Sequence, residues 1–162
     1  GFIMAINFGD GSIQEFSGKI IQVKRALRAS QIVTTSSSMS DVTSISFTPK
    51  SSSSRIHCNF TGVAYVSEDP GGMKGRFYDA TDSNVFGTSL GTDVPLLFRF
   101  DLQQLSNGGI YAYAGITWRA DEASWGTSAK EIKFQMGLLG NGTVGFITEY
   151  LPATFTIQEV ME

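Results

Sequence analysis

The sequence has one cysteine and one histidine in 162 residues. Cys58 alone excludes an intrachain disulfide framework and any multi-cysteine metal site. His57 is its direct neighbour, and adjacent residues of a strand point to opposite faces, so the two side chains cannot act as a thiol–imidazole pair. A serine triad would have to use His57, but the sequence contains no Gly-x-Ser-x-Gly turn of the kind that presents the nucleophilic serine. We therefore expect no enzyme activity, no bound metal and no cofactor.

Charged residues are scarce as well. They make up 17% of the chain, below the roughly 25% of an average soluble domain, and the formal net charge is −3. An acidic chain without a basic stripe does not attract nucleic acid or anionic lipid. The basic cluster of Lys24, Arg25 and Arg28 is interpreted as a solvated turn. No apolar run approaches the ~18 residues of a membrane-spanning helix, so we predict neither nucleic-acid binding nor membrane insertion.

Paired carboxylates are the remaining catalytic signal, because glycoside hydrolysis needs two acids across a cleft. The candidates are Glu68 with Asp69, Asp79 with Asp82, and Asp121 with Glu122. All are assigned to turn-like segments, where acids cap and solvate the chain. Residues 79–84 differ from a calcium-binding EF-hand loop, which needs alternating carboxylates, a glycine and a distant glutamate. Turn chemistry is the favoured interpretation, and a carboxylate-pair glycosidase is the enzyme alternative.

Hydrophobic and polar residues alternate along most of the chain. In residues 55–66, Ile56, Cys58 and Phe60 share one face, which predicts a half-buried strand. Gly62 within it predicts a bulge or a close backbone contact. About eight or nine strands are predicted by this alternation, the others lying in or near residues 20–23, 42–47, 75–78, 96–102, 110–118, 131–136, 144–147 and 154–158. The strongest hairpin signals are Asn107-Gly108 and Asn141-Gly142.

Strands and turns at regular spacing, without a long helical stripe, predict an all-β fold. We expect a two-sheet antiparallel sandwich of jelly-roll type in one domain. Around the turn Gly9–Gly11, residues 4–8 and 12–16 predict either a small hairpin or an extended arm. The predicted division is an N-terminal arm at 1–18 and a β-sandwich at 19–162.

Outward-facing aromatic residues are the candidate functional residues. Tyr65, Tyr111 and Tyr113 fall opposite the apolar sides of their strands, and Trp125 lies in a loop that contains glycine and serine. Aromatic surface on strands marks a subunit interface or a platform on which sugars stack. A third interpretation is that loops cover this face, and the sequence leaves all three open.

Three parts of the chain resemble small bacteriophage and marine-virus structural proteins. Residues 4–14 resemble an N-terminal arm that precedes a Gly-Lys-Ile-Ile-Gln-Val strand, here Gly18–Val23. Phe47–Ile56 resembles a Thr-Pro-x-Ser-Ser-Ser segment, and Thr154–Val160 resembles the closing strand. The similar segments span the whole chain, but nothing from Ser67 to Val94 matches.

This resemblance implies a virion component, either a tail-fibre or receptor-binding tip or a capsid decoration protein. Such proteins are commonly trimers of jelly rolls, similar to tumour-necrosis-factor and complement-type domains. A homotrimer would bury Tyr65, Tyr111 and Tyr113 around its axis, the arm would contact other virion proteins, and a host-surface glycan is a further expected partner. The resemblance supplies no catalytic residues. The rival is a carbohydrate-binding module outside a virion, in which Trp125 and the tyrosines stack on sugar rings.

Overall fold

The structure is a computed structural model that describes residues 5–7, 13–15, 19–67, 71–86, 96–100, 112–123, 126–148 and 151–161. All regular elements in these ranges are strands: β1 (Ala5–Asn7), β2 (Ile13–Glu15), β3 (Lys19–Arg28), β4 (Ile32–Thr34), β5 (Ser40–Phe47), β6 (Arg55–Val66), β7 (Gly71–Asp79), β8 (Asn84–Val85), β9 (Leu96–Phe100), β10 (Ala112–Ala123), β11 (Lys130–Gly140), β12 (Val144–Ile147) and β13 (Ala153–Met161). Among the described residues there is no helix that could cross a membrane.

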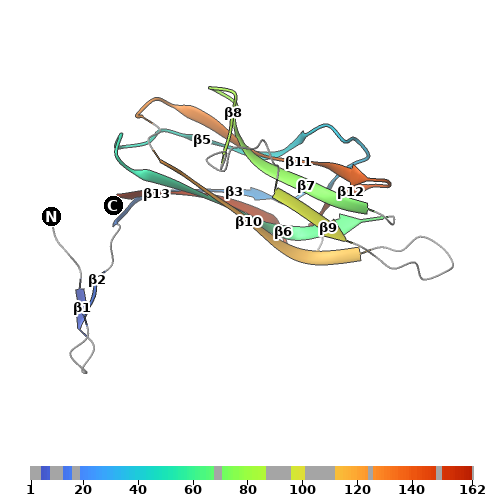
Figure 1. Cartoon of the computed structure of the whole chain (residues 1–162), viewed down its shortest axis with the longest axis horizontal. Coiled ribbons are helices and arrows are strands. Elements are labelled where there is room, and N and C mark those ends of the chain that lie inside the picture. Colours follow the sequence, from blue (N-terminus) through green and yellow to red (C-terminus); the bar gives the residue numbers. More distant parts are fainter. Residues whose placement is uncertain are drawn as a thin grey trace.

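Two antiparallel sheets form the body of the molecule, and each is named here after its central strand. The β6 sheet has the order β3-β13-β6-β12-β4, with β10 also paired to β6. β10 follows one edge of β6 along its whole length, whereas β13 and β12 divide the other edge between them. The β11 sheet has the order β5-β11-β7-β8, with β9 also paired to β7. Figure 1 shows the sheets stacked as two layers.

The path of the chain between these layers is that of a jelly roll. The long strands are ordered β3-β13-β6-β10 in one sheet and β5-β11-β7-β9 in the other, so the chain repeatedly crosses from sheet to sheet. The first and last long strands, β3 and β13, lie side by side. This is the double Greek-key arrangement of jelly-roll sandwiches. The predicted all-β jelly-roll sandwich is therefore confirmed.

A cluster of phenylalanines fills the space between the sheets. Phe60 of β6 and Phe134 of β11 stack with ring centroids 3.9 Å apart, and Phe146 meets Phe60 edge-on at 4.9 Å. Phe77 of β7 stacks on Phe155 of β13 at 5.6 Å. Each of the five rings is fully or almost fully buried. Burying one such side chain contributes ~1.5–3 kcal/mol, and this core fixes which residues of each strand face outward.

Gly62 is the place where β6 meets the core most tightly. The register of β6 with β10 continues through Gly62 without interruption, so of the two predicted features the close contact is present rather than a bulge. A Cβ atom at this position would lie 2.8 Å from Cδ1 of Phe146 and 3.1 Å from Cβ of Ala153. Only a glycine allows β6, β12 and β13 to pack at this spacing.

The turn at Asn141-Gly142 differs from its prediction. Gly140 and Gly142 adopt positive φ angles of 90° and 92°, as expected of a glycine-dependent turn. However, β11 pairs with β5 and β7, whereas β12 pairs with β4 and β6. The hairpin prediction is therefore wrong, because this turn carries the chain from one sheet to the other. Asn107-Gly108 lies outside the described residues.

The basic cluster also differs from its prediction, because Lys24, Arg25 and Arg28 lie on strand β3 rather than in a turn. Lys24 Nζ donates to the carbonyl of Ser46 at 3.1 Å, and Arg28 Nη1 donates to that of Val42 at 3.1 Å. Both acceptors belong to β5 of the other sheet. Two of the three cations thus connect the edges of the sheets.

The N-terminal strands form a small sheet of their own. β1 and β2 pair antiparallel, with Ile6 opposite Gln14, and neither is paired with a strand of the two large sheets. Of the two predicted forms of the arm, these strands adopt the hairpin. The turn Gly9–Gly11 lies outside the described residues, and the domain boundary after residue 18 stays a prediction.

Candidate functional site

The outer face of the β6 sheet is assembled from several strands by their register. On β13, Phe155, Ile157 and Glu159 are buried, so the residues between them face outward. Four outward rows join β13 to its neighbours, and these rows are Thr61–Thr154–Leu27, Asn59–Thr156–Arg25, His57–Gln158–Val23 and Arg55–Val160–Ile20. The outer edge is a hydrophobic residue of β3 in three of these rows and Arg25 in the fourth.

The hydrophobic edge positions form an apolar stripe, defined as Ile20, Val23 and Leu27 of β3 with Val33 of β4. Their exposed fractions are 53%, 53%, 55% and 47%. Among the described strands, β3 pairs only with β13 and β4 pairs only with β12, so both lie on the same side of β6. A fifth exposed hydrophobic residue, Leu151, lies in the loop between β12 and β13. Among the side chains that the structure describes, every large exposed hydrophobic residue belongs to this part of the molecule.

Tyr65 lies in a row that ends at the apolar stripe. It is half-buried on β6, with Tyr113 of β10 opposite it on one side and Gly145 of β12 on the other. Gly145 in turn pairs with Val33. A Cβ atom at Gly145 would lie 2.6 Å from Cγ1 of Val33, so the valine side chain leans over the glycine.

The structure places only two of the four predicted site residues next to each other. Register places Tyr65 and Tyr113 side by side, whereas Tyr111 and Trp125 lie outside the described residues. The roles assigned to these four residues stay predictions. The sequence analysis missed the exposed residues of β3, because an alternation of apolar and polar residues does not reveal which face is covered.

The outer face of the β11 sheet has the opposite character. Asp41 Oδ2 lies 2.7 Å from Lys133 Nζ, and Asp41 Oδ1 accepts a 2.6 Å hydrogen bond from Gln135. Arg76 donates to Gln135 at 2.7 Å and lies over the ring of Tyr78. Burial raises the pKa of Asp41, but the hydrogen bonds from Gln135 and Lys133 outweigh it, so this pKa is lowered. Such a network suits a face that stays in water.

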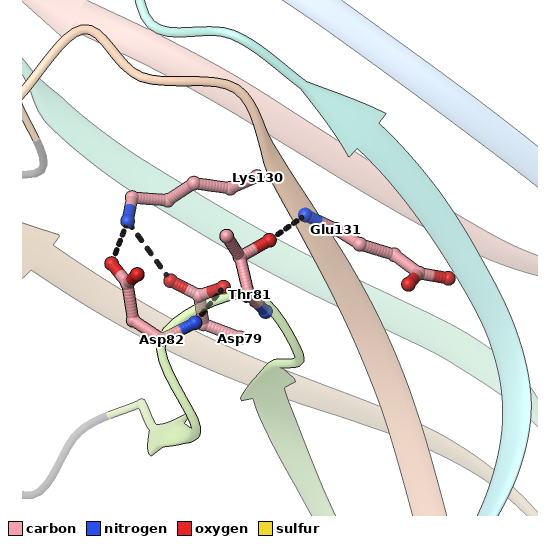
Figure 2. A network of polar contacts seen from close by, with 5 residues as sticks. All are labelled: Asp79, Thr81, Asp82, Lys130 and Glu131. Carbon is pink, nitrogen blue, oxygen red and sulfur yellow. Dashed lines mark hydrogen bonds and ion pairs between the residues drawn. The ribbon is translucent and has the colours of Figure 1, made fainter.

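The turn after β7 holds the acids that the sequence suggested for a metal or a catalytic pair (Figure 2). Asp79 Oδ1 accepts the backbone N–H groups of Thr81 at 2.9 Å and Asp82 at 3.3 Å. Lys130 Nζ lies 3.2 Å from Asp79 Oδ2 and also contacts Asp82 Oδ2. The hydrogen bond to Asp82 raises the pKa of Lys130 against the opposing effect of burial. The lysine ammonium therefore pairs with both carboxylates, and the cluster stabilises a turn.

The other acidic pairs add no site to the described part of the chain. Asp121 and Glu122 lie on strand β10, not in a turn as predicted, and Glu68 and Asp69 lie outside the described residues. Within the ranges that the structure describes, no three His, Cys, Asp or Glu residues are grouped so that they could hold a metal ion.

Glu159 is a buried carboxylate that the sequence analysis missed. Its side chain accepts hydrogen bonds from the backbone N–H of Lys50 at 2.8 Å and of Ser51 at 3.0 Å. The hydroxyl of Ser54 donates at 2.7 Å and the amide of Gln22 at 3.1 Å. Burial raises the pKa of Glu159, but these hydrogen bonds stabilise the carboxylate and lower its pKa overall. The signal was present, because Phe155, Ile157 and Glu159 continue one alternating row.

The Glu159 network joins the three segments on which the resemblance rests. Gln22 belongs to Gly18–Val23, the serine-rich donors belong to Phe47–Ile56, and Glu159 belongs to Thr154–Val160. All the carboxylate oxygens are occupied by internal donors. These segments thus have a structural role, which is to attach the β5–β6 loop to β3 and β13.

Comparisons with known proteins give similarity to solved structures only. No family model matches the sequence, and no curated protein matches it. The fold is similar to that in the crystal structure of the infectious bursal disease virus VP2 subviral particle, with a TM-score of 0.47 and 10% identity. It is also similar to the structure of infectious bursal disease virus Gx strain, with a TM-score of 0.41 and 12% identity. In both cases the match covers 98% of this chain and 44% of the other.

Proposed function

We propose that the chain is a virion structural protein that assembles through the outer face of the β6 sheet, forming a homotrimeric tail-fibre domain for host adhesion. One observation carries this proposal. The apolar stripe lies on the outer face of one sheet, whereas the outer face of the other carries ion pairs. Exposed apolar residues gathered on one face mark sites of association, and a protein that worked alone in water would have no use for such a division.

The face is large enough for a stable contact. β3 has 10 residues, which corresponds to about 33 Å at ~3.3 Å per residue. The rows from β10 to β3 cross four strands, or about 15–20 Å at ~4.8 Å per strand. The flat area is therefore roughly 500–660 Å², which is of the same order as the ~800 Å² that one partner contributes to a standard interface.

The resemblance to phage and marine-virus proteins supports the choice of a virion and of a trimer. A closed ring of three copies uses heterologous contacts, in which one surface of each copy meets a different surface of the next. Tyr65 and Tyr113 lie in the rows that such a contact would cover. A capsid decoration protein would use the same assembly at another position in the particle.

Light scattering coupled to size-exclusion chromatography tests the assembly. The full-length chain is expected to elute with the mass of three copies at micromolar concentration, and a clean monomer would contradict the proposal. The genes beside its own test the virion role. Tail, capsid or portal genes are expected there, whereas secreted glycan-degrading enzymes would contradict a viral origin.

A carbohydrate-binding module is the second candidate, favoured by the register that sets Tyr65 beside Tyr113. Adjacent aromatic residues on a sheet face suit stacking on sugar rings. This candidate predicts a monomer that binds to a glycan array and loses binding in Tyr65→Ala and Trp125→Ala. A trimer whose glycan binding is unchanged by both substitutions would exclude it.

A further inference from the structure

Among the strands that the structure describes, none of either large sheet pairs with the β1–β2 hairpin. Figure 1 shows it clear of both layers. An isolated two-stranded hairpin is at best marginally stable in water, since it needs a third strand or a packed face for independent stability. An arm of this kind therefore gains stability by binding to another surface.

The composition of the arm indicates what that surface is. Residues 1–18 are rich in large apolar residues, and their charged side chains are all acidic. The acids are Asp10 and Glu15, and the apolar residues are Phe2, Ile3, Met4, Ile6, Phe8, Ile13 and Phe16. The complementary surface is apolar and basic.

The apolar stripe has this complementary character. Arg25 lies on β3 between Val23 and Leu27 and is exposed. β3 as a whole carries four basic residues and no acidic residue. The strand that bears most of the stripe is thus positively charged, although the whole chain carries a net charge of −3.

A neighbouring copy, rather than the same chain, is the better source of an arm that covers the apolar stripe. In the single chain the stripe stays about half exposed while the hairpin pairs only with itself. Because residues 5–7 pair back onto residues 13–15, the arm reaches about half of its extended length, or roughly 30 Å at ~3.3–3.6 Å per residue. This is comparable with the length of β3, so an arm that leaves one copy can reach the stripe of the next.

We propose that the arm of each copy, residues 1–18, binds the apolar stripe of an adjacent copy, with Asp10 and Glu15 facing Arg25. The inference rests on the proposed assembly and specifies the contact that holds it. In a closed ring the arm of every copy binds the apolar stripe of the next copy, so no copy is left with an exposed apolar edge.

Variants of the full-length chain that each carry one introduced cysteine, with Cys58 replaced by serine, test the exchange. Glu15→Cys and Arg25→Cys chains with different tags are coexpressed, oxidised and analysed by non-reducing electrophoresis. A disulfide between the two differently tagged chains is expected. The matched control replaces Arg25→Cys with Ser44→Cys, an exposed position on the outer face of the β11 sheet, and should give no cross-link. Two results would overturn the inference. One is that Glu15→Cys cross-links equally with Arg25→Cys and with Ser44→Cys, and the other is that a chain carrying both Glu15→Cys and Arg25→Cys forms the disulfide only within itself.

Charge reversal provides a second readout that separates this inference from the proposed function. Asp10→Lys with Glu15→Lys is expected to weaken assembly about tenfold or more, and so is Arg25→Glu. Combining the three substitutions is expected to restore assembly, because the charges become complementary again. A trimer that none of these substitutions weakens refutes arm binding and leaves the assembly proposal intact. A monomeric wild-type chain refutes both.

Discussion

The hydroxyl of Ser54 donates a 2.7 Å hydrogen bond to the carboxylate of Glu159, although the two residues are 105 positions apart in the chain. Glu159 is fully buried, and Ser54 is nearly so. The bond joins the loop before β6 to the last strand of the jelly roll. Because burial makes an unpaired carboxylate costly, the donors around Glu159 and the carboxylate depend on one another.

Replacing Glu159 should therefore destabilise the fold. Glu159→Gln removes the charge and presents an amide N–H₂ to backbone donors that need an acceptor. We expect the free energy of unfolding to fall by about 2–3 kcal/mol, as for the loss of charged hydrogen bonds. Urea denaturation measures this change. Glu131→Gln, on the exposed face of β11, is the control and should change stability by less than ~0.5 kcal/mol. Equal effects in the two variants would contradict the role of Glu159.

The same carboxylate predicts how stability depends on acid. The pKa of Glu159 is lowered from its ordinary 4.5, so its contribution is complete above that pH and is lost as pH falls through the lower pKa of the folded state. Unfolding measured at a series of acidic pH values should show this loss in the wild type. In Glu159→Gln the decline should be shallower. Parallel curves for the two proteins would show that the carboxylate is not stabilised by folding.

Lys130 makes the corresponding prediction for alkaline conditions. Its pKa is raised from 10.5, so its contribution is present below that pH and is lost as pH rises through the higher folded pKa. At neutral pH, Lys130→Met should cost about 1–3 kcal/mol, because Asp79 stays buried without its cation. A double-mutant cycle with Asp79→Asn measures the coupling between them. Additive effects would mean that the ion pair contributes nothing.

Two glycines on neighbouring strands offer a matched pair for packing. Gly62→Ala places a methyl group against Phe146, and such overpacking typically costs about 1–3 kcal/mol. A Cβ atom at Gly115 of β10 would have no atom within 4 Å, so Gly115→Ala should be neutral or slightly stabilising. Thermal unfolding of both variants compares them. Equal destabilisation would show that β-strand propensity, rather than contact with Phe146, decides the outcome.

Much of the fold could be predicted because jelly-roll strands alternate strictly between a buried and an outer face. Residues 55–66 were predicted as a strand with the correct inward row, and this strand is β6. The turn at Asn141-Gly142 was misjudged because local turn chemistry does not specify which sheet the next strand joins. Lys24 and Arg28 were misjudged for a related reason, since their acceptors on β5 are distant in sequence.

The candidate site was predictable only in part. Outward alternation identified Tyr65 and Tyr113, and register brought them together. Ile20, Val23 and Leu27 are exposed. Their exposure depends on which strand lies at the edge of the sheet and on whether another element covers that strand. Both are properties of the tertiary structure. Glu159 could have been identified by extending the buried row of β13 by one step, but its donors come from segments far away in the chain.

The central claim is that the apolar stripe is an assembly surface, and the solution mass of Leu27→Asp tests it most directly. Leu27 is exposed in the single chain, so the substitution should leave folding intact, as circular dichroism can verify. Ser44→Asp, on the opposite outer face, is the control. Light scattering should give the mass of three chains for the wild type and for Ser44→Asp, and the mass of one chain for Leu27→Asp. A folded Leu27→Asp protein with the same mass as the wild type would contradict the claim.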